Sequence, residues 1–186
     1  MKIISISLVL FFTCISFLHT TAQEVVVSSQ RGERLLTWED FQGKPDRSSP
    51  FFAETFWDLD FRTTAIGSNS DNISSKNVAL TLTFNHRKSW LKKDKGTGEL
   101  LKHEQGHFDI GRLCQLEILS ILQTTVLTKT NFATTVQSVF DAGFKKYVAL
   151  GKKYDEETNH SINSDKQEDW NNFLQLEKER LLKLNQ

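Results

Sequence analysis

The five residues His103-Glu104-Gln105-Gly106-His107 constrain this chain more than any other stretch, because they match the H-E-x-x-H pattern. In that pattern a helix presents two histidines to one zinc ion and a glutamate to a water molecule beside it. A step of four residues on an α-helix turns the chain by about 40° and advances it by about 6 Å, so the two imidazoles lie one above the other. We therefore expect a helix here, with His103 and His107 as zinc ligands and Glu104 as general base.

A third ligand must come from elsewhere in the chain, because catalytic zinc usually has three protein ligands and an open fourth position. The chain lacks the additional histidine that metzincins carry six residues after the motif. Glu117 lies about 15 Å farther along the same helix and cannot reach the metal. The segment 154–160 is the richest in polar side chains after the helix, and we prefer His160 over an acidic residue of that segment. His86 is a third alternative.

Two stretches alternate between apolar and polar residues in the manner of half-buried strands, 51–64 and 78–84. We expect them to pair as an antiparallel hairpin, and we expect residues 24–28 to form a short strand or an extended arm. Residues 85–97 are rich in lysine and glycine and predict a connecting loop. Trp38 and Phe41, three residues apart, predict one helical turn packed on the core.

Helical periodicity begins near Thr97, a suitable N-cap, and predicts a helix of about 25 residues that carries the motif. A second helix is expected over 131–154, where Gly151 is a candidate C-terminus, and a third over 167–184, with irregular chain between them. Together these elements predict an α+β, zincin-like fold in which a small antiparallel sheet packs on the long H-E-x-x-H helix, accompanied by two further helices.

The first 22 residues have the pattern of a secretory signal peptide. Lys2 precedes an apolar run over 3–18, and small residues stand just before Gln23. The run is shorter than a membrane-spanning helix needs, so we expect no stable membrane anchor after cleavage and a secreted or periplasmic protein. Cleavage would remove Cys14 and leave Cys114 as the only thiol, so the mature chain cannot form an internal disulfide.

The charge and length of the chain bear on its partners and on the number of its domains. Lys+Arg and Asp+Glu both number 23, and neither half of the chain carries a block of one sign. Nucleic acid is therefore not expected as a partner. No second composition regime or repeat interrupts residues 23–186, which predicts a single metallopeptidase domain, and we expect a monomer.

Several segments together resemble one bacterial family, the domain of unknown function 922, whose members are labelled secreted zinc-dependent proteases. The resemblance rests on the run 101–110 and on four further segments: Trp38-Glu39-Asp40-Phe41, Ser89-Trp90, Tyr154-Asp155-x-x-Thr158-x-His160, and the later Gln167 and Trp170. One departure is Ser161, where the family pattern usually has glycine. The resemblance implies a zinc-dependent protease, a label that itself derives from the motif.

The expected function is that of a secreted zinc-dependent hydrolase, most simply a peptidase acting on a protein or peptide substrate. Zinc on His103, His107 and His160 would activate water, Glu104 would move the proton, and Tyr154 is a candidate donor to the developing oxyanion. Two alternatives remain. One is a zinc-stabilised binding module without catalysis, and the other is an amidase that acts on the peptide links of the cell wall.

Overall fold

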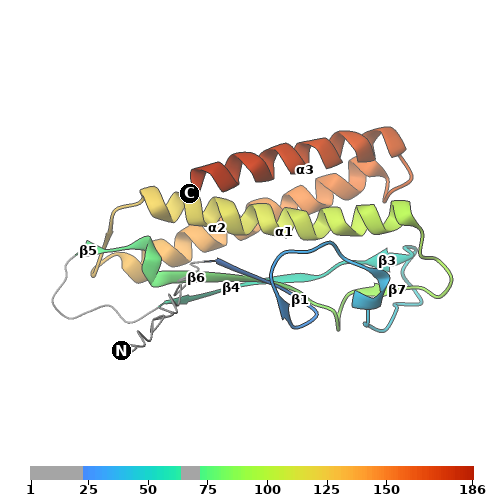
Figure 1. Ribbon diagram of the computed structural model, residues 1–186, viewed down its shortest axis with the longest axis horizontal. Coiled ribbons are helices and arrows are strands. Elements are labelled where there is room, and N and C mark those ends of the chain that lie inside the picture. The colour runs from blue at the N-terminus through green and yellow to red at the C-terminus, as the bar shows by residue number, and fades with distance from the viewer. Residues whose placement is uncertain (1–22, 64–71) are drawn as a thin grey trace, which may run out of the picture.

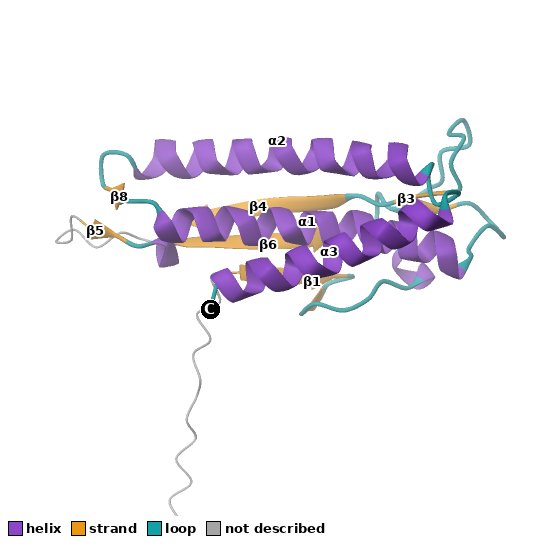
Figure 2. Cartoon of the chain, turned by 90° about the horizontal axis from the view of Figure 1, so that it is seen from above, coloured by secondary structure: helices purple, strands orange, loops and turns teal. Residues whose placement is uncertain are grey.

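The computed structural model describes residues 23–63 and 72–186, which form three long helices lying over a mixed β-sheet (Figures 1 and 2). The helices are α1 (Gly98–Thr124), α2 (Phe132–Thr158) and α3 (Ser164–Leu184). The strands are β1 (Gln23–Val27), β2 (Gln30–Arg31), β3 (Ala53–Glu54), β4 (Trp57–Thr63), β5 (Asn72–Ile73), β6 (Val78–Phe84), β7 (Trp90–Leu91) and β8 (Leu127–Thr128).

The main sheet has the strand order β2-β1-β6-β4. β4 pairs antiparallel with β6 over its whole length, from Trp57 opposite Phe84 to Thr63 opposite Val78, which confirms the predicted hairpin pairing. β1, however, pairs parallel with β6. The prediction of a purely antiparallel sheet was therefore wrong, because alternation along a strand specifies its buried face and not the direction of its neighbour.

The predicted strand over 51–64 is interrupted near Phe56, where the alternation fails. β3 pairs with β7, whereas β4 pairs with β6, so the two halves belong to different sheets. Ser89 lies at the break, where its hydroxyl accepts from the backbone N–H of Phe56 and donates to the carbonyl of the same residue. Thr55, at this break, donates from its hydroxyl to the backbone carbonyl of Glu104 on α1. The predicted loop over 85–97 contains the short strand β7.

Helix α1 is the centre of the molecule. It begins where predicted, with the Thr97 hydroxyl accepting from the backbone N–H of Leu100. Fifteen of its 27 residues are buried, since the helix packs on β6 and β4 on one side and on α2 and α3 on the other (Figure 1). A helix with partners on several sides needs apolar residues around most of its circumference, as its second half has.

Helices α2 and α3 are both longer than their sequence patterns predict. α2 continues through Gly151 to Thr158, and α3 begins at Ser164, so only a short turn joins them. A glycine within a helix costs about 1 kcal/mol relative to alanine and does not by itself end the helix. The extension matters for function because it places Asp155 on helix α2 rather than in a loop.

The predicted turn at Trp38–Phe41 is a 3-10 helix over Trp38–Asp40, and the two aromatic rings pack with their centroids 4.9 Å apart. Asp40 is buried in this turn. Its carboxylate pairs with the guanidinium of Arg34 and accepts from the hydroxyl of Ser28 and the backbone N–H of Thr37. Burial opposes ionisation of Asp40, but these contacts outweigh it and hold the pKa of the carboxyl well below its usual range.

We expect Asp40→Asn to lower the free energy of unfolding at pH 7 by about 2–3 kcal/mol. Because the folded-state pKa is depressed, the ionised carboxylate stabilises the protein fully above its unfolded pKa of about 4 and progressively less as the pH falls below it. Urea unfolding at several pH values should show the difference between the wild type and the variant shrinking below pH ~4. The matched variant Asp60→Asn changes an exposed carboxylate of β4 and should leave stability nearly unchanged. A difference between wild type and Asp40→Asn that stays constant across pH would contradict the assignment.

Within the described residues, no helix is both long enough and apolar enough to cross a membrane. The predicted signal peptide lies outside the described residues. The described part of the chain shares one hydrophobic core, to which the main sheet and all three helices contribute.

Candidate metal centre

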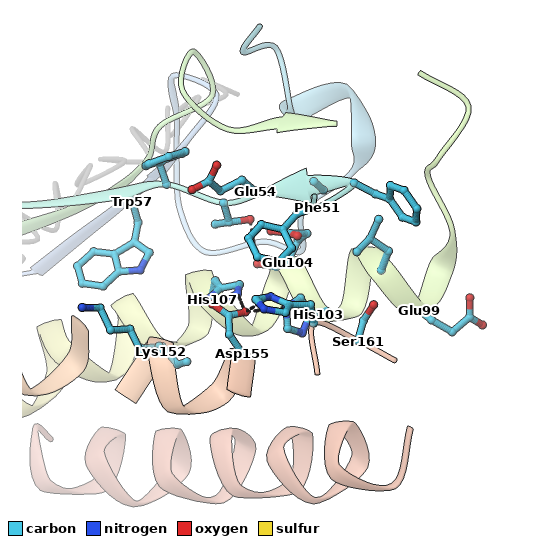
Figure 3. A pocket seen from close by; sticks show the side chains of 18 of the residues that line it. Phe51, Glu54, Trp57, Glu99, His103, Glu104, His107, Lys152, Asp155 and Ser161 are labelled. Atoms are coloured by element: carbon cyan, nitrogen blue, oxygen red, sulfur yellow. Dashed lines mark hydrogen bonds and ion pairs between the residues drawn. The ribbon is translucent and has the colours of Figure 1, made fainter. Parts of the chain in front are cut away.

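Three side chains from two helices converge on one point. The Nε2 atoms of His103 and His107, on α1, lie 3.1 and 2.9 Å from the same carboxylate oxygen, Oδ1 of Asp155 on α2. One potential ligand atom from each of the three residues lies within 4.8 Å of the other two. Figure 3 shows the two imidazoles and the carboxylate meeting between the helices.

These distances suit a bound metal ion. Zinc binds histidine nitrogen and carboxylate oxygen at about 2.0–2.1 Å in tetrahedral geometry, which separates neighbouring ligand atoms by about 3.3 Å. The observed nitrogen-to-oxygen distances of 3.1 and 2.9 Å are close to that spacing. The two histidines and Asp155 therefore form a plausible set of three protein ligands with room for a fourth.

The second nitrogen of His103 is held by α3. Its Nδ1 lies 3.0 Å from Oε1 of Gln167, while the Gln167 amide nitrogen donates to Tyr154 and Asn171. The amide oxygen of Gln167 thus accepts from Nδ1–H of His103, which leaves the lone pair of a neutral imidazole on Nε2, toward Asp155. A lone pair facing a carboxylate is unfavourable, so this contact requires either a proton or a metal cation between Nε2 and the Asp155 carboxylate.

The pKa values of His107 and Asp155 are shifted by the contact between these two side chains. Burial lowers the pKa of His107, but its hydrogen bond to Asp155 and the nearby charge of Glu104 outweigh burial, so the pKa is raised. Burial likewise raises the pKa of Asp155, but the two imidazoles outweigh it and hold that pKa well below its usual range. The carboxylate is therefore ionised and available as a ligand at neutral pH.

His160, the ligand preferred from sequence, lies next to this group but outside it. Its Nδ1 is 3.3 Å from Oδ1 of Asp155, and its ring packs at a tilt on Phe51 with centroids 4.0 Å apart. Residues 159–161 all have positive φ, between 47° and 73°, so the chain turns sharply after α2. Within the described residues, His160 does not belong to the group whose potential ligand atoms all lie within 4.8 Å of one another. The geometry thus favours Asp155, the acidic alternative from the same segment, as third ligand.

Tyr154 does not occupy the position expected of an oxyanion donor. It is fully buried, its ring stacks on His103 at 4.6 Å, and its hydroxyl donates to the backbone carbonyl of His103. The hydroxyl also lies against Gly106, where a Cβ atom would collide with it. Tyr154 therefore packs in the core against the H-E-x-x-H motif and does not face a substrate. Gly106 is required for this close packing.

Glu104 is buried beside the histidines. It is 3% exposed, and its Oε2 is one of two buried side-chain atoms in the described residues that have no hydrogen-bond partner. Burial raises the pKa of this carboxyl, although the nearby His107 opposes the shift. The Thr55 hydroxyl donates to the backbone carbonyl of Glu104 and thereby joins the bend between β3 and β4 to α1. A buried carboxylate with one unpartnered oxygen, beside potential metal ligands, has the placement expected of a general base.

The candidate ligands and Glu104 open into a cavity of about 950 Å³ between the β3–β4 bend, α1 and α2 (Figure 3). This volume is at the upper end of the usual range for ligand sites. His103, Glu104, His107, Asp155 and His160 line the cavity, whereas Tyr154 does not. His86, the other alternative ligand, is not among the lining residues either.

We expect Gln167→Leu to weaken zinc binding about 10–100-fold, since hydrogen bonds to the outer nitrogen of a metal-binding histidine typically contribute that much. The substitution keeps a side chain of similar size but removes the acceptor for His103. A chelator-competition titration measures the change. Asn171→Leu, which removes a partner of Gln167 but no contact to the histidine, is the matched control. Equal zinc affinity in the wild type and Gln167→Leu would show that Gln167 does not orient His103.

Comparison with known proteins identifies one family. Residues 27–161 match the model of a bacterial protein of unknown function, DUF922. No curated protein and no solved structure matches the chain. The match covers more than half of the chain and includes His103, Glu104, His107, Asp155 and His160, but it ends before Gln167. The chain therefore belongs to the DUF922 family.

Proposed function

We propose that this protein is a zinc-dependent hydrolase, most simply a peptidase, built on a zincin-like fold. The observation that carries the proposal is the convergence of His103, His107 and Asp155 around one point, with the buried carboxylate of Glu104, whose Oε2 has no partner, in the same cavity. The sequence motif supplies three of these four side chains, and the fold brings the fourth from 48 residues beyond His107.

A zinc ion on His103, His107 and Asp155 would lower the pKa of a bound water to about 7 and polarise the substrate carbonyl. Glu104 accepts a proton from the water as its oxygen attacks the carbonyl carbon. The C–N bond then breaks, and Glu104 delivers the proton to the leaving nitrogen, so one water is consumed and a carboxylate and an amine are released. The raised pKa of Glu104 suits a group that must both take and return a proton.

The setting of this activity is proposed from the sequence. The first 22 residues resemble a cleaved signal peptide, so we infer a secreted or periplasmic protein that acts on protein or peptide substrates as a monomer. The binding-module alternative differs from this proposal because it predicts no hydrolysis. The cell-wall-amidase alternative differs because its substrate is the peptide part of the cell wall.

The test is an assay of the purified residues 23–186 with denatured casein and with purified peptidoglycan. We expect one zinc ion per chain, hydrolysis of casein, loss of activity on chelation and recovery on addition of zinc. Zinc at one per chain with no hydrolysis of either substrate would favour the binding module. Hydrolysis of peptidoglycan alone would favour the amidase, and absence of zinc binding would overturn the proposal.

A further inference from the structure

The cavity that contains the metal centre gathers apolar side chains at its surface. Of the eleven exposed large apolar side chains in the described residues, five line this cavity, namely Phe51, Phe52, Phe144, Val148 and Ile162. Soluble proteins seldom gather exposed apolar side chains around one concavity unless that surface binds something. The cavity therefore favours apolar groups of a ligand, in addition to whatever its metal ligands bind.

These side chains form two groups on opposite sides of Asp155. Phe144 and Val148 precede Asp155 on α2 by eleven and seven residues, which places them about 16 and 10 Å from it along the helix axis. Trp57 packs against Phe144 with ring centroids 5.5 Å apart, so it lies at the same end. Figure 3 shows Trp57 on the side of the cavity away from Ser161. We call Trp57, Phe144 and Val148 the helix lobe.

The opposite end of the cavity begins where α2 stops. Ile162, which is 77% exposed, lies in the turn after the helix, and the ring of Phe51 packs at a tilt on His160 of that turn. Phe52 lies beside Phe51 in the chain and lines the same cavity. We call Phe51, Phe52 and Ile162 the turn lobe. The metal ligands therefore lie between two apolar lobes.

Charges at the cavity do not select one sign of substrate. Asp94 and Glu99 line it together with Lys95 and Lys152, so two acidic and two basic side chains balance one another outside the metal centre. The one further charge, Glu54, has a raised pKa because of its burial. Apolar contact, not charge, is the property that both ends of the cavity share.

We propose that the substrate is an extended apolar peptide segment that crosses the metal centre, with large aliphatic or aromatic side chains in both lobes. An extended chain advances about 3.3–3.6 Å per residue, so the 16 Å from Asp155 to the level of Phe144 accommodates roughly four to five residues on that side. The cleaved bond lies between the residues that fill the two lobes. This inference rests on the proposed peptidase function, and it specifies the substrate class and the residues that select it.

The test measures peptide binding without turnover, using the zinc-loaded Glu104→Gln protein. The probes are two fluorescein-labelled octapeptides, one with four central phenylalanine and leucine residues and one with four central glutamines. We expect the apolar peptide to bind at least about tenfold more tightly by fluorescence anisotropy, since each well-buried apolar side chain contributes about tenfold or more. Equal affinity for the two peptides would overturn the inference.

Charged substitutions in each lobe locate the binding surface. In the same protein, Val148→Glu and Ile162→Glu should each weaken binding of the apolar peptide about tenfold, because a carboxylate would have to be buried against it. Leu176→Glu changes an exposed leucine of α3 outside the cavity and is the matched control. Equal weakening by all three substitutions, or by none, would overturn the assignment of the lobes. Circular dichroism melts confirm that each variant is folded.

Two outcomes separate this inference from the proposed function. If the apolar peptide binds with the expected pattern but the wild type cleaves no protein, the peptidase proposal fails and the apolar site remains. If the wild type cleaves casein at sites without apolar flanking residues, the peptidase proposal stands and the inference fails. Binding to phosphatidylcholine vesicles that Val148→Glu abolishes, without any preference between the peptides, would assign the lobes to lipid and also overturn it.

Discussion

Glu104→Gln is expected to retain one zinc ion per chain and to lose hydrolytic activity by about 10²–10⁴-fold, because general acid–base groups contribute rate enhancements of this size. Glutamine has nearly the same shape as glutamate but cannot accept and return a proton. The two histidines and Asp155 remain in place, so zinc affinity should change little. Zinc content by atomic absorption and the rate of casein hydrolysis, measured on the same preparation, give the two quantities.

Glu54→Gln provides the matched control for this substitution. Glu54 lines the same cavity, and burial raises its pKa in the same direction as that of Glu104. If loss of any carboxylate from the cavity impaired hydrolysis, both variants would lose activity to a similar degree. We expect Glu54→Gln to keep activity within about tenfold of the wild type, well short of what removing a catalytic base costs. Full activity in Glu104→Gln would exclude Glu104 as the base.

Asp155→Ala is expected to weaken zinc binding by more than the 10–100-fold that loss of an outer hydrogen bond to a ligand typically costs. The substitution removes both a candidate ligand atom and the negative charge that faces the two imidazoles at 3.1 and 2.9 Å. His160→Ala removes only a contact to Asp155 and should stay within about 10–100-fold. Competition with a chromophoric chelator at fixed pH measures all the affinities.

The exposed neighbour Glu156 supplies the control for Asp155. Glu156→Ala removes the same charge from the adjacent residue of α2 and should leave zinc affinity unchanged. If His160→Ala proves more damaging than Asp155→Ala, the sequence preference for His160 is restored and Asp155 becomes its hydrogen-bond partner. The two hypotheses predict opposite rankings of zinc affinity for Asp155→Ala and His160→Ala, so the comparison decides which residue is the third ligand.

Local patterns in the sequence predicted the parts of the structure that depend on local rules. The H-E-x-x-H spacing specified a helix with two histidines on one side, and the Thr97 cap marked where that helix begins. The alternation in 78–84 and in most of 57–63 predicted two strands whose antiparallel pairing the structure confirms. In these cases residues close in the chain determine the outcome.

Features that depend on distant contacts were not predictable in the same way. The parallel partner of β6 is β1, which precedes it by more than fifty residues. The sequence favoured His160 over an acidic residue of the segment 154–160 because neutral imidazole is a common zinc ligand, and Gly151 suggested that α2 ends near residue 154. The buried residues Tyr147, Tyr154 and Thr158 continue the helical spacing past that glycine, and this spacing would have placed Asp155 on the helix. Gln167 was known only from the family resemblance, and nothing local indicates that it contacts His103.

The central position of α1 has a consequence for how the site can open. The two histidines lie on the most enclosed helix of the fold, so they cannot separate without disrupting the core that stabilises the whole chain. Asp155 lies within one turn of the end of α2, but its neighbours Tyr154 and Thr158 are fully buried, so this end of the helix is also held by the core. Both halves of the candidate site are therefore fixed, and a bound ion would exchange with solvent through the cavity rather than by separation of the helices.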